Sequence, residues 1–245
     1  RGVHVTVVEG ASHVMPPIDM DMAHQVHNYI RAQGIDLYLG QTCTAMDKDG
    51  VILKDGRKIP ADMVILSIGV RPDTGFLKDS GIELGARGEI LVNSDMETSA
   101  PDVYALGDAA SVRHIVSGKQ VLIPLASPAN KQGRIVGDNL CGRKTAYKGS
   151  QGTSIMKFFG LTVAVTGEKE ESLQAQGRAF CKVITTSASQ AGYYPGGEMM
   201  TVKTLFEPDT GRILGAQIVG GKGVLMIWQM QFALALQALI CRRWS

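Results

Sequence analysis

A carboxylate at the end of an apolar strand is one residue of this sequence whose type and place could bind a ligand. Glu9 directly follows the β-branched run 3–8. In a dinucleotide-binding unit, an acidic side chain there accepts hydrogen bonds from the adenosine ribose hydroxyls, and it would repel a 2′-phosphate, which favours NADH over NADPH. Many strands end on an acidic residue that binds nothing, so Glu9 alone leaves both interpretations open.

A second carboxylate, Asp108, follows the predicted strand 103–106 and has small neighbours. Gly107, Ala109 and Ala110 would let a cofactor lie against the backbone. An ordinary Gly-Asp turn is the alternative.

A helix predicted over 129–140 offers a different kind of site. Pro124 and Pro128 precede it, and Gly142 is placed to end it. The free backbone N–H groups at the start of a helix, and the positive end of its dipole, stabilise negative charge on a ligand. An ordinary surface helix is the alternative.

The elements that position these residues predict an α/β unit with a parallel sheet in the first part of the chain. The dipeptides Asp49-Gly50 and Asp55-Gly56 are typical of hairpin turns, so a small antiparallel ribbon is expected inside it. The expected elements are a strand over 3–8, a helix over 20–33, the ribbon within 42–67, and strands over 63–68, 89–92 and 103–106.

Beyond a boundary near Gly149 the pattern changes to an α+β domain built on an antiparallel sheet. The expected elements are strands over 153–158, 161–166, 180–186, 199–206 and 213–219, and a helix over 169–176.

The composition excludes several kinds of partner. The 245 residues are 44% hydrophobic and 20% charged with a formal net charge of +2, so no attraction to nucleic acid or to an anionic membrane is expected. The apolar run 225–240 is shorter than the roughly 20 residues of a membrane-spanning helix. Four scattered cysteines predict reduced thiols in a cytoplasmic protein and no metal site: Cys43, Cys141, Cys181 and Cys241.

Three segments resemble motifs of the pyridine nucleotide-disulfide oxidoreductase family. The stretch 98–108 resembles its second FAD motif, in which the final aspartate binds the ribityl hydroxyls of the flavin. The stretch 65–72 resembles the strand and Gly-x-Arg-Pro turn that lead out of the NAD domain, and 123–134 resembles the segment that brings a helix N-terminus to the isoalloxazine ring. The resemblance implies FAD as cofactor and these cofactor-binding residues: Gly69, Gly107, Asp108, Leu125, Ala126 and Ser127.

The last domain resembles the dimerisation domain of coenzyme A-disulfide reductases and the related NADH oxidases and peroxidases, in segments 151–153, 191–196 and 215–217. The resemblance implies a homodimer. In these relatives a tyrosine of the Tyr-Tyr-Pro-Gly segment reaches toward the partner's redox cysteine and the bound coenzyme A. Tyr193 or Tyr194 is therefore expected to be a catalytic acid or hydrogen-bond donor to a thiolate, and Asn130 a substrate contact. Tyrosines that only pack at the interface are the alternative.

The resemblance predicts part of an FAD-dependent oxidoreductase that moves electrons from NAD(P)H through FAD to a cysteine and a small disulfide such as coenzyme A disulfide. An NADH oxidase or peroxidase is a second hypothesis. Because the redox cysteine and phosphate loops of the family are expected ahead of Arg1, an inactive fragment that only self-associates is a third. The expected organisation is the remainder of an NAD(P)-binding domain over 1–70, a C-terminal segment of an FAD-binding domain over 71–149, a dimerisation domain over 150–224 and an atypical tail over 225–245.

The tail departs from the amphipathic helix of the family because it is apolar on nearly every side and carries Trp228 and Trp244. A permitted choice of codons, read one nucleotide out of step, spells a sequence that resembles the family pattern. The hypothesis is a frameshift after about Val224, and a genuine variant helix is the alternative.

Overall fold

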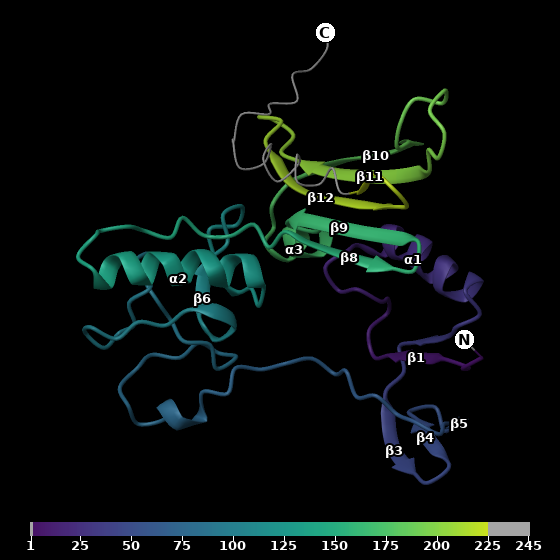
Figure 1. The fold of residues 1–245 in the computed structure, drawn as a ribbon, viewed down its shortest axis with the longest axis horizontal. Helices are drawn as coiled ribbons and strands as arrows, with labels where there is room; N and C mark the ends of the chain where they lie inside the picture. The colour runs from purple at the N-terminus through teal and green to yellow at the C-terminus, as the bar shows by residue number, and fades with distance from the viewer. Residues whose placement is uncertain (1, 225–245) are drawn as a thin grey trace. The chain divides into compact units, whose positions relative to one another are not determined.

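Figure 1 shows the fold of the computed structural model, which describes residues 2–224. The chain forms two compact units. One contains the described residues up to Ser67 and from Ile155 onward, and the other spans Ile68–Ser154. Each unit has a hydrophobic core of its own. The tail 225–245, for which a frameshift was expected, lies outside the described residues.

The first unit begins with a parallel strand pair joined by a helix. Strand β1 (Thr6–Glu9) pairs in parallel with β2 (Asp36–Leu39), and α1 (Met20–Ala32) connects them. One face of α1 is buried, because apolar side chains recur at helical spacing, as in Met22, Val26 and Ile30. The predicted α/β unit with a parallel sheet is confirmed.

The antiparallel ribbon is also present. Strands β3 (Cys43–Asp47), β4 (Gly50–Leu53) and β5 (Lys58–Pro60) form a three-stranded sheet in sequence order. Gly50 has φ +145°, and a Cβ at this position would lie 2.1 Å from the carbonyl oxygen of Ile59, so only glycine fits the first turn.

The strand predicted over 63–68 is not formed. This segment has no strand partner among the residues that the structure describes, and Ile65 and Ile68 are 81% and 91% exposed. A strand needs the backbone hydrogen bonds of a neighbour, which an apolar run cannot supply by itself. The prediction was therefore wrong for the described chain.

A five-stranded antiparallel sheet completes the first unit, in the order β10-β11-β12-β9-β8. The central strand β12 is almost entirely buried, and α1 packs against the sheet in one core with Val163, Val165 and Val219. The predicted antiparallel sheet and its helix are confirmed, with bounds β8 (Ser154–Phe158), β9 (Leu161–Gly167), α3 (Glu170–Ala175), β10 (Cys181–Ala188), β11 (Met199–Phe206) and β12 (Ile213–Gly220).

The second unit has little regular structure. Its elements are the 3-10 turns η1 (Gly75–Leu77) and η2 (Gly107–Ala109), the hairpin β6 (Ser111–Arg113) and β7 (Gln120–Leu122), and helix α2 (Ala126–Leu140). The strands predicted over 89–92 and 103–106 form only isolated bridges, such as Ile90 with Ala110 and Glu97 with Tyr104.

Helix α2 begins three residues before the predicted start at 129 and includes Pro128 in its first turn. Proline is tolerated there because the N–H groups of the first turn have no partner within the helix. Among residues 2–224, no helix has the length and apolar character that crossing a membrane requires.

Candidate functional site

In the second unit, the turn that carries Asp108 is open on the side where a ligand would lie. The chain is extended at Leu106 and then enters η2 through Gly107, whose φ of +83° favours glycine. A Cβ placed on Gly107 would meet nothing within 4 Å, and the side chain of Asp108 is exposed. The turn therefore presents a carboxylate beside bare backbone, which suits the hydroxyl groups of a ligand.

Gln132 fixes this turn to α2. The backbone N–H of Gly107 donates a hydrogen bond of 2.7 Å to Oε1 of Gln132, and Gln132 is 1% exposed. Tyr147 also hydrogen-bonds to Gln132, and burial raises the pKa of the tyrosine hydroxyl. Sequence analysis missed this role, although the sequence carried a signal. Gln132 lies midway between Pro128 and Val136 on the buried face of α2, where an apolar residue is the norm.

Helix α2 contacts the same turn, and its N-terminus offers further groups to a ligand. No side chain caps the helix at Leu125, and the backbone N–H groups of Ala126 and Ser127 have no hydrogen-bond partner in the part of the chain that the structure describes. The positive end of the helix dipole is therefore available to an electron-rich group. Asn130 lies one turn on, and its Nδ2 donates to the carbonyl oxygen of Ala126 at 3.0 Å.

Five of the expected cofactor-binding residues therefore lie on η2 and at the start of α2, two elements that contact each other: Gly107, Asp108, Leu125, Ala126 and Ser127. Gly69 belongs to the same unit but lies at its start. Its φ is +95° and a Cβ there would meet nothing within 4 Å, as close approach of a ligand to the backbone requires. An exposed carboxylate, an open glycine and free helix N–H groups could bind a ligand that carries hydroxyl groups and an electron-rich edge.

In the first unit, Glu9 lies at the carboxyl end of β1, the edge of a parallel sheet where ligands bind. Its Oε1 accepts a hydrogen bond of 2.8 Å from the backbone N–H of Ala11, which orients the carboxylate. The other oxygen, Oε2, has no hydrogen-bond partner among residues 2–224, so it is free to accept from a hydroxyl.

Tyr193 and Tyr194 lie on the loop between β10 and β11 in the same unit. Their rings contact each other with centroids 4.8 Å apart, and they are 83% and 59% exposed. Two adjacent exposed tyrosines are typical of a surface that contacts a partner, because each ring offers apolar area and a polar tip.

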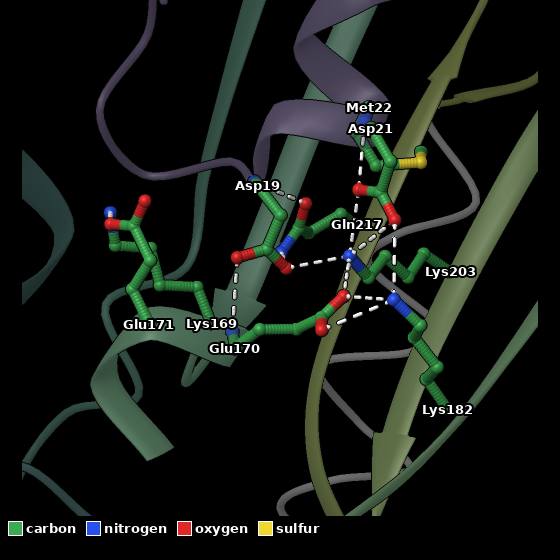
Figure 2. Close-up of polar contacts among 9 residues, drawn as sticks. All are labelled: Asp19, Asp21, Met22, Lys169, Glu170, Glu171, Lys182, Lys203 and Gln217. Carbon is green, nitrogen blue, oxygen red and sulfur yellow. Dashed lines mark hydrogen bonds and ion pairs between the residues drawn. The ribbon is translucent and has the colours of Figure 1, made fainter. Parts of the chain in front are cut away.

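A cluster of charges around the buried Lys203 joins α1, α3 and the antiparallel sheet (Figure 2). Ligand oxygens of Asp19, Asp21 and Glu170 lie within 4.8 Å of one another, close enough to hold a metal ion. The Nζ of Lys203 lies among them, however, and supplies the positive charge. Sequence analysis did not find this cluster, because its members come from four separate elements.

Three of the four cysteines lie in the described chain, and Cys43, Cys141 and Cys181 are free and exposed. None of them pairs in a disulfide.

Comparison with known proteins agrees with these features. The pyridine nucleotide-disulphide oxidoreductase family matches residues 1–133, and the dimerisation domain of that family matches residues 153–241. The chain belongs to this family. The predicted family and fold class are thus confirmed.

Several members of the family are similar over most of the chain. The CoA-dependent NAD(P)H sulfur oxidoreductase of Pyrococcus furiosus is 33% identical over 91% of this chain and 51% of its own length. The crystal structure of reduced CoADR-RHD from Bacillus anthracis has a TM-score of 0.93 and 40% identity, over 96% of this chain and 43% of that one. Other similar proteins are a coenzyme A disulfide reductase and an NADH oxidase.

A further solved structure bears on cofactor choice. A water-forming NADPH oxidase engineered from the Lactobacillus brevis NADH oxidase has a TM-score of 0.89 and 28% identity, over 96% of this chain and 54% of that one. Its changes include an aspartate to alanine and, seven positions later, a proline to arginine. The chain spans about half the length of the curated relatives that it matches.

Proposed function

We propose that this chain forms part of an FAD-dependent oxidoreductase that passes electrons from NAD(P)H through FAD to a cysteine and a small disulfide, such as coenzyme A disulfide. The observation that carries the proposal is the hydrogen bond from Gly107 to Gln132, which joins the turn that carries Asp108 to α2. The names of the relatives support the substrate class, since they include a coenzyme A disulfide reductase and a CoA-dependent sulfur oxidoreductase.

Bound FAD would supply the hydride and electron transfer chemistry. In this chain, the carboxylate of Asp108 would bind the ribityl hydroxyls, and the bare backbone at Gly107 would let them approach. The N–H groups of Ala126 and Ser127 would face the electron-rich edge of the isoalloxazine ring. The positive end of the helix dipole would stabilise negative charge there, so the reduced ring would bind more tightly.

We assign NADH as the preferred nicotinamide cofactor. Glu9 would accept hydrogen bonds from the ribose hydroxyls of NADH, and its charge would repel the 2′-phosphate of NADPH. In the oxidase engineered to use NADPH, an aspartate and a proline seven positions later are both replaced. The same spacing separates Glu9 from Pro16 in this chain.

The tyrosines Tyr193 and Tyr194 are proposed to act in a homodimer, where one hydroxyl would donate a hydrogen bond to a thiolate of the partner subunit. Their exposure supports this role, as does the match of residues 153–241 to a dimerisation domain. Asn130 would contact the substrate from α2. Reduction of oxygen or peroxide is the second candidate function, favoured by the relatives that are NADH oxidases.

The two candidate functions differ in the electron acceptor, which an activity assay can identify. The protein as its gene encodes it would be supplied with NADH and either coenzyme A disulfide or oxygen, and thiol formation and oxygen uptake would be measured. Thiol formation that is lost in the double variant Tyr193→Phe/Tyr194→Phe, with flavin retained, supports disulfide reduction. Oxygen uptake without thiol formation would favour the oxidase. A protein that binds no flavin and oxidises no NADH would refute both.

A further inference from the structure

Lys203 is a fully buried charge on β11. It is 0% exposed, and its Nζ donates hydrogen bonds of 2.7 and 2.8 Å to the two carboxylate oxygens of Asp21. It also forms ion pairs with Asp19, at 2.9 Å, and with Glu170 (Figure 2). Burial alone would lower the pKa of Lys203, but hydrogen bonds to the three carboxylates outweigh it and raise the pKa, so the ammonium stays charged.

Asp19 is the residue through which this cluster holds α1. It is the N-cap of that helix, and its backbone N–H donates to Oε1 of Gln217 on β12 at 2.8 Å. In return, Nε2 of Gln217 donates to Oδ2 of Asp19 at 2.6 Å, and the backbone N–H of Glu170 donates to Oδ1 at 3.0 Å. The start of α1 is thereby attached to two strands of the sheet and to α3.

The segment 10–18 connects this anchor to Glu9. Val14 and Ile18 are buried in the core that α1 shares with the sheet. The backbone N–H of Val14 donates to Nε2 of His27 at 3.2 Å, and burial, with smaller repulsion from Arg31, lowers the pKa of His27 and so keeps that nitrogen able to accept. The segment is joined to the Glu9 carboxylate through the N–H of Ala11 at one end and is attached to the sheet through Asp19 at the other.

We propose that Lys203 is a positioning residue for the nicotinamide dinucleotide. Its ammonium holds Asp19 against the sheet, Asp19 fixes the end of the segment 10–18, and that segment sets the position of the Glu9 carboxylate and of Pro16. The proposal rests on the nucleotide role proposed for Glu9. A buried lysine of the antiparallel sheet would thus position a binding site at the end of the parallel strand pair.

The test compares Lys203→Met with Lys182→Met. Lys182 belongs to the same cluster and pairs with Glu170 at 2.9 Å, but its side chain is 46% exposed. Within residues 2–224 it forms no hydrogen bond or ion pair with Asp19. Hydrogen exchange would be followed without nucleotide at the amides of Val14, Ile18 and Asp19. NADH affinity would be measured on the full-length protein that contains flavin.

Lys203→Met should speed exchange at these amides about tenfold and weaken NADH binding about fivefold, with kcat changed less than about twofold. Lys182→Met should change neither. Unchanged exchange in Lys203→Met, or faster exchange with unchanged NADH affinity, would overturn the proposal. If the wild-type protein binds no NADH, the proposed function fails. The exchange measurement still tests whether Lys203 fixes the segment 10–18 through Asp19. Should Lys203→Met not fold, Asp19→Asn replaces it with the same expected results.

Discussion

Asp19 and Gln217 are 198 positions apart in the sequence and exchange two hydrogen bonds. The backbone N–H of Asp19 donates to Oε1 of Gln217, and Nε2 of Gln217 donates to Oδ2 of Asp19. Both residues are buried, so each bond is made where water cannot replace it. The pair therefore links the N-cap of α1 to the central strand of the antiparallel sheet.

Replacing Gln217 by leucine should lower the free energy of unfolding by about 2 kcal/mol, because it leaves a buried N–H of Asp19 without an acceptor. Gln174→Leu, at an exposed position of α3, is the matched control and should change stability by less than about 0.5 kcal/mol. Urea unfolding followed by circular dichroism measures both. Equal stability of the two variants would show that the pair contributes little.

Sequence patterns predicted most of the regular elements, because their signals are local. The turn dipeptides Asp49-Gly50 and Asp55-Gly56 and the helical spacing of Met22, Val26 and Ile30 need no knowledge of distant residues. The strand predicted over 63–68, which is not formed, depends instead on a distant neighbour. Its apolar run is compatible with a strand, but strand formation depends on a neighbour, and a single segment carries no information about one.

The candidate site shows the same difference between local signals and those that depend on distant residues. Asp108 and Glu9 were proposed as site residues because one follows a predicted strand and the other ends β1, and the glycine conformation at Gly107 follows from its residue type. Gln132 and Lys203 were missed because a buried polar residue has a meaning only through its partners, which come from other elements.

Lys203→Ala should destabilise the protein by about 3 kcal/mol, because it leaves the buried carboxylate of Asp19, and its more exposed neighbours Asp21 and Glu170, without their counter-charge. The oxygens of Asp19, Asp21 and Glu170 lie within 4.8 Å of one another, so Ca²⁺ should then bind among them and restore part of the stability. Thermal unfolding with and without millimolar calcium measures this effect. Wild type and Lys182→Ala, in which the Lys203 ammonium is still present, should show no response to calcium.

The cluster should also determine stability on the acid side. Burial would raise the pKa of Asp21 and of Glu170, but hydrogen bonds outweigh it and lower both pKa values below their ordinary 3.8 and 4.5. Lys203 donates to both carboxylates, and Lys182 donates to Glu170. Folding therefore gains stability above those ordinary values and loses it as the pH falls through the lower, folded ones. The raised pKa of Lys203 adds stability below its ordinary 10.5 that is lost only as the pH rises past the folded value.

Stability from this source should thus be constant from about pH 5 to about pH 10 and fall below about pH 4. Urea unfolding across this range, on wild type and Glu170→Gln, measures the effect. The variant should be less stable near neutral pH and show a shallower loss in acid. An acid limb of the same slope in both proteins would assign the loss to other groups.

Asp108→Ala should reduce the flavin bound per chain at least about tenfold in the protein as its gene encodes it, because charge-assisted hydrogen bonds to the ribityl hydroxyls are lost. The visible absorbance of the purified protein, divided by its absorbance at the protein band, gives the ratio. Asp73→Ala, an exposed carboxylate of the same unit, is the control and should keep its flavin. Full flavin content in Asp108→Ala would remove this residue from the binding site.

Cofactor choice should change when the carboxylate of Glu9 is replaced and a positive charge is added beside it. Gly10 has no left-handed conformation, and a Cβ there would lie 3.2 Å from the Thr42 methyl group, so an arginine fits with a small shift. The triple variant Glu9→Ala/Gly10→Arg/Pro16→Arg removes the repulsion of a 2′-phosphate and supplies two partners for it.

The ratio of kcat/KM for NADPH to that for NADH should rise at least about tenfold, which corresponds to about 1.4 kcal/mol of transition-state binding. Asp36→Ala is the control, since Asp36 pairs in register with Thr6 at the opposite end of the two strands. Steady-state rates with each nucleotide measure the ratio. If it stays at the wild-type value while the variant keeps its flavin and its overall rate, Glu9 does not bind the ribose, and the nucleotide contacts lie elsewhere in the protein.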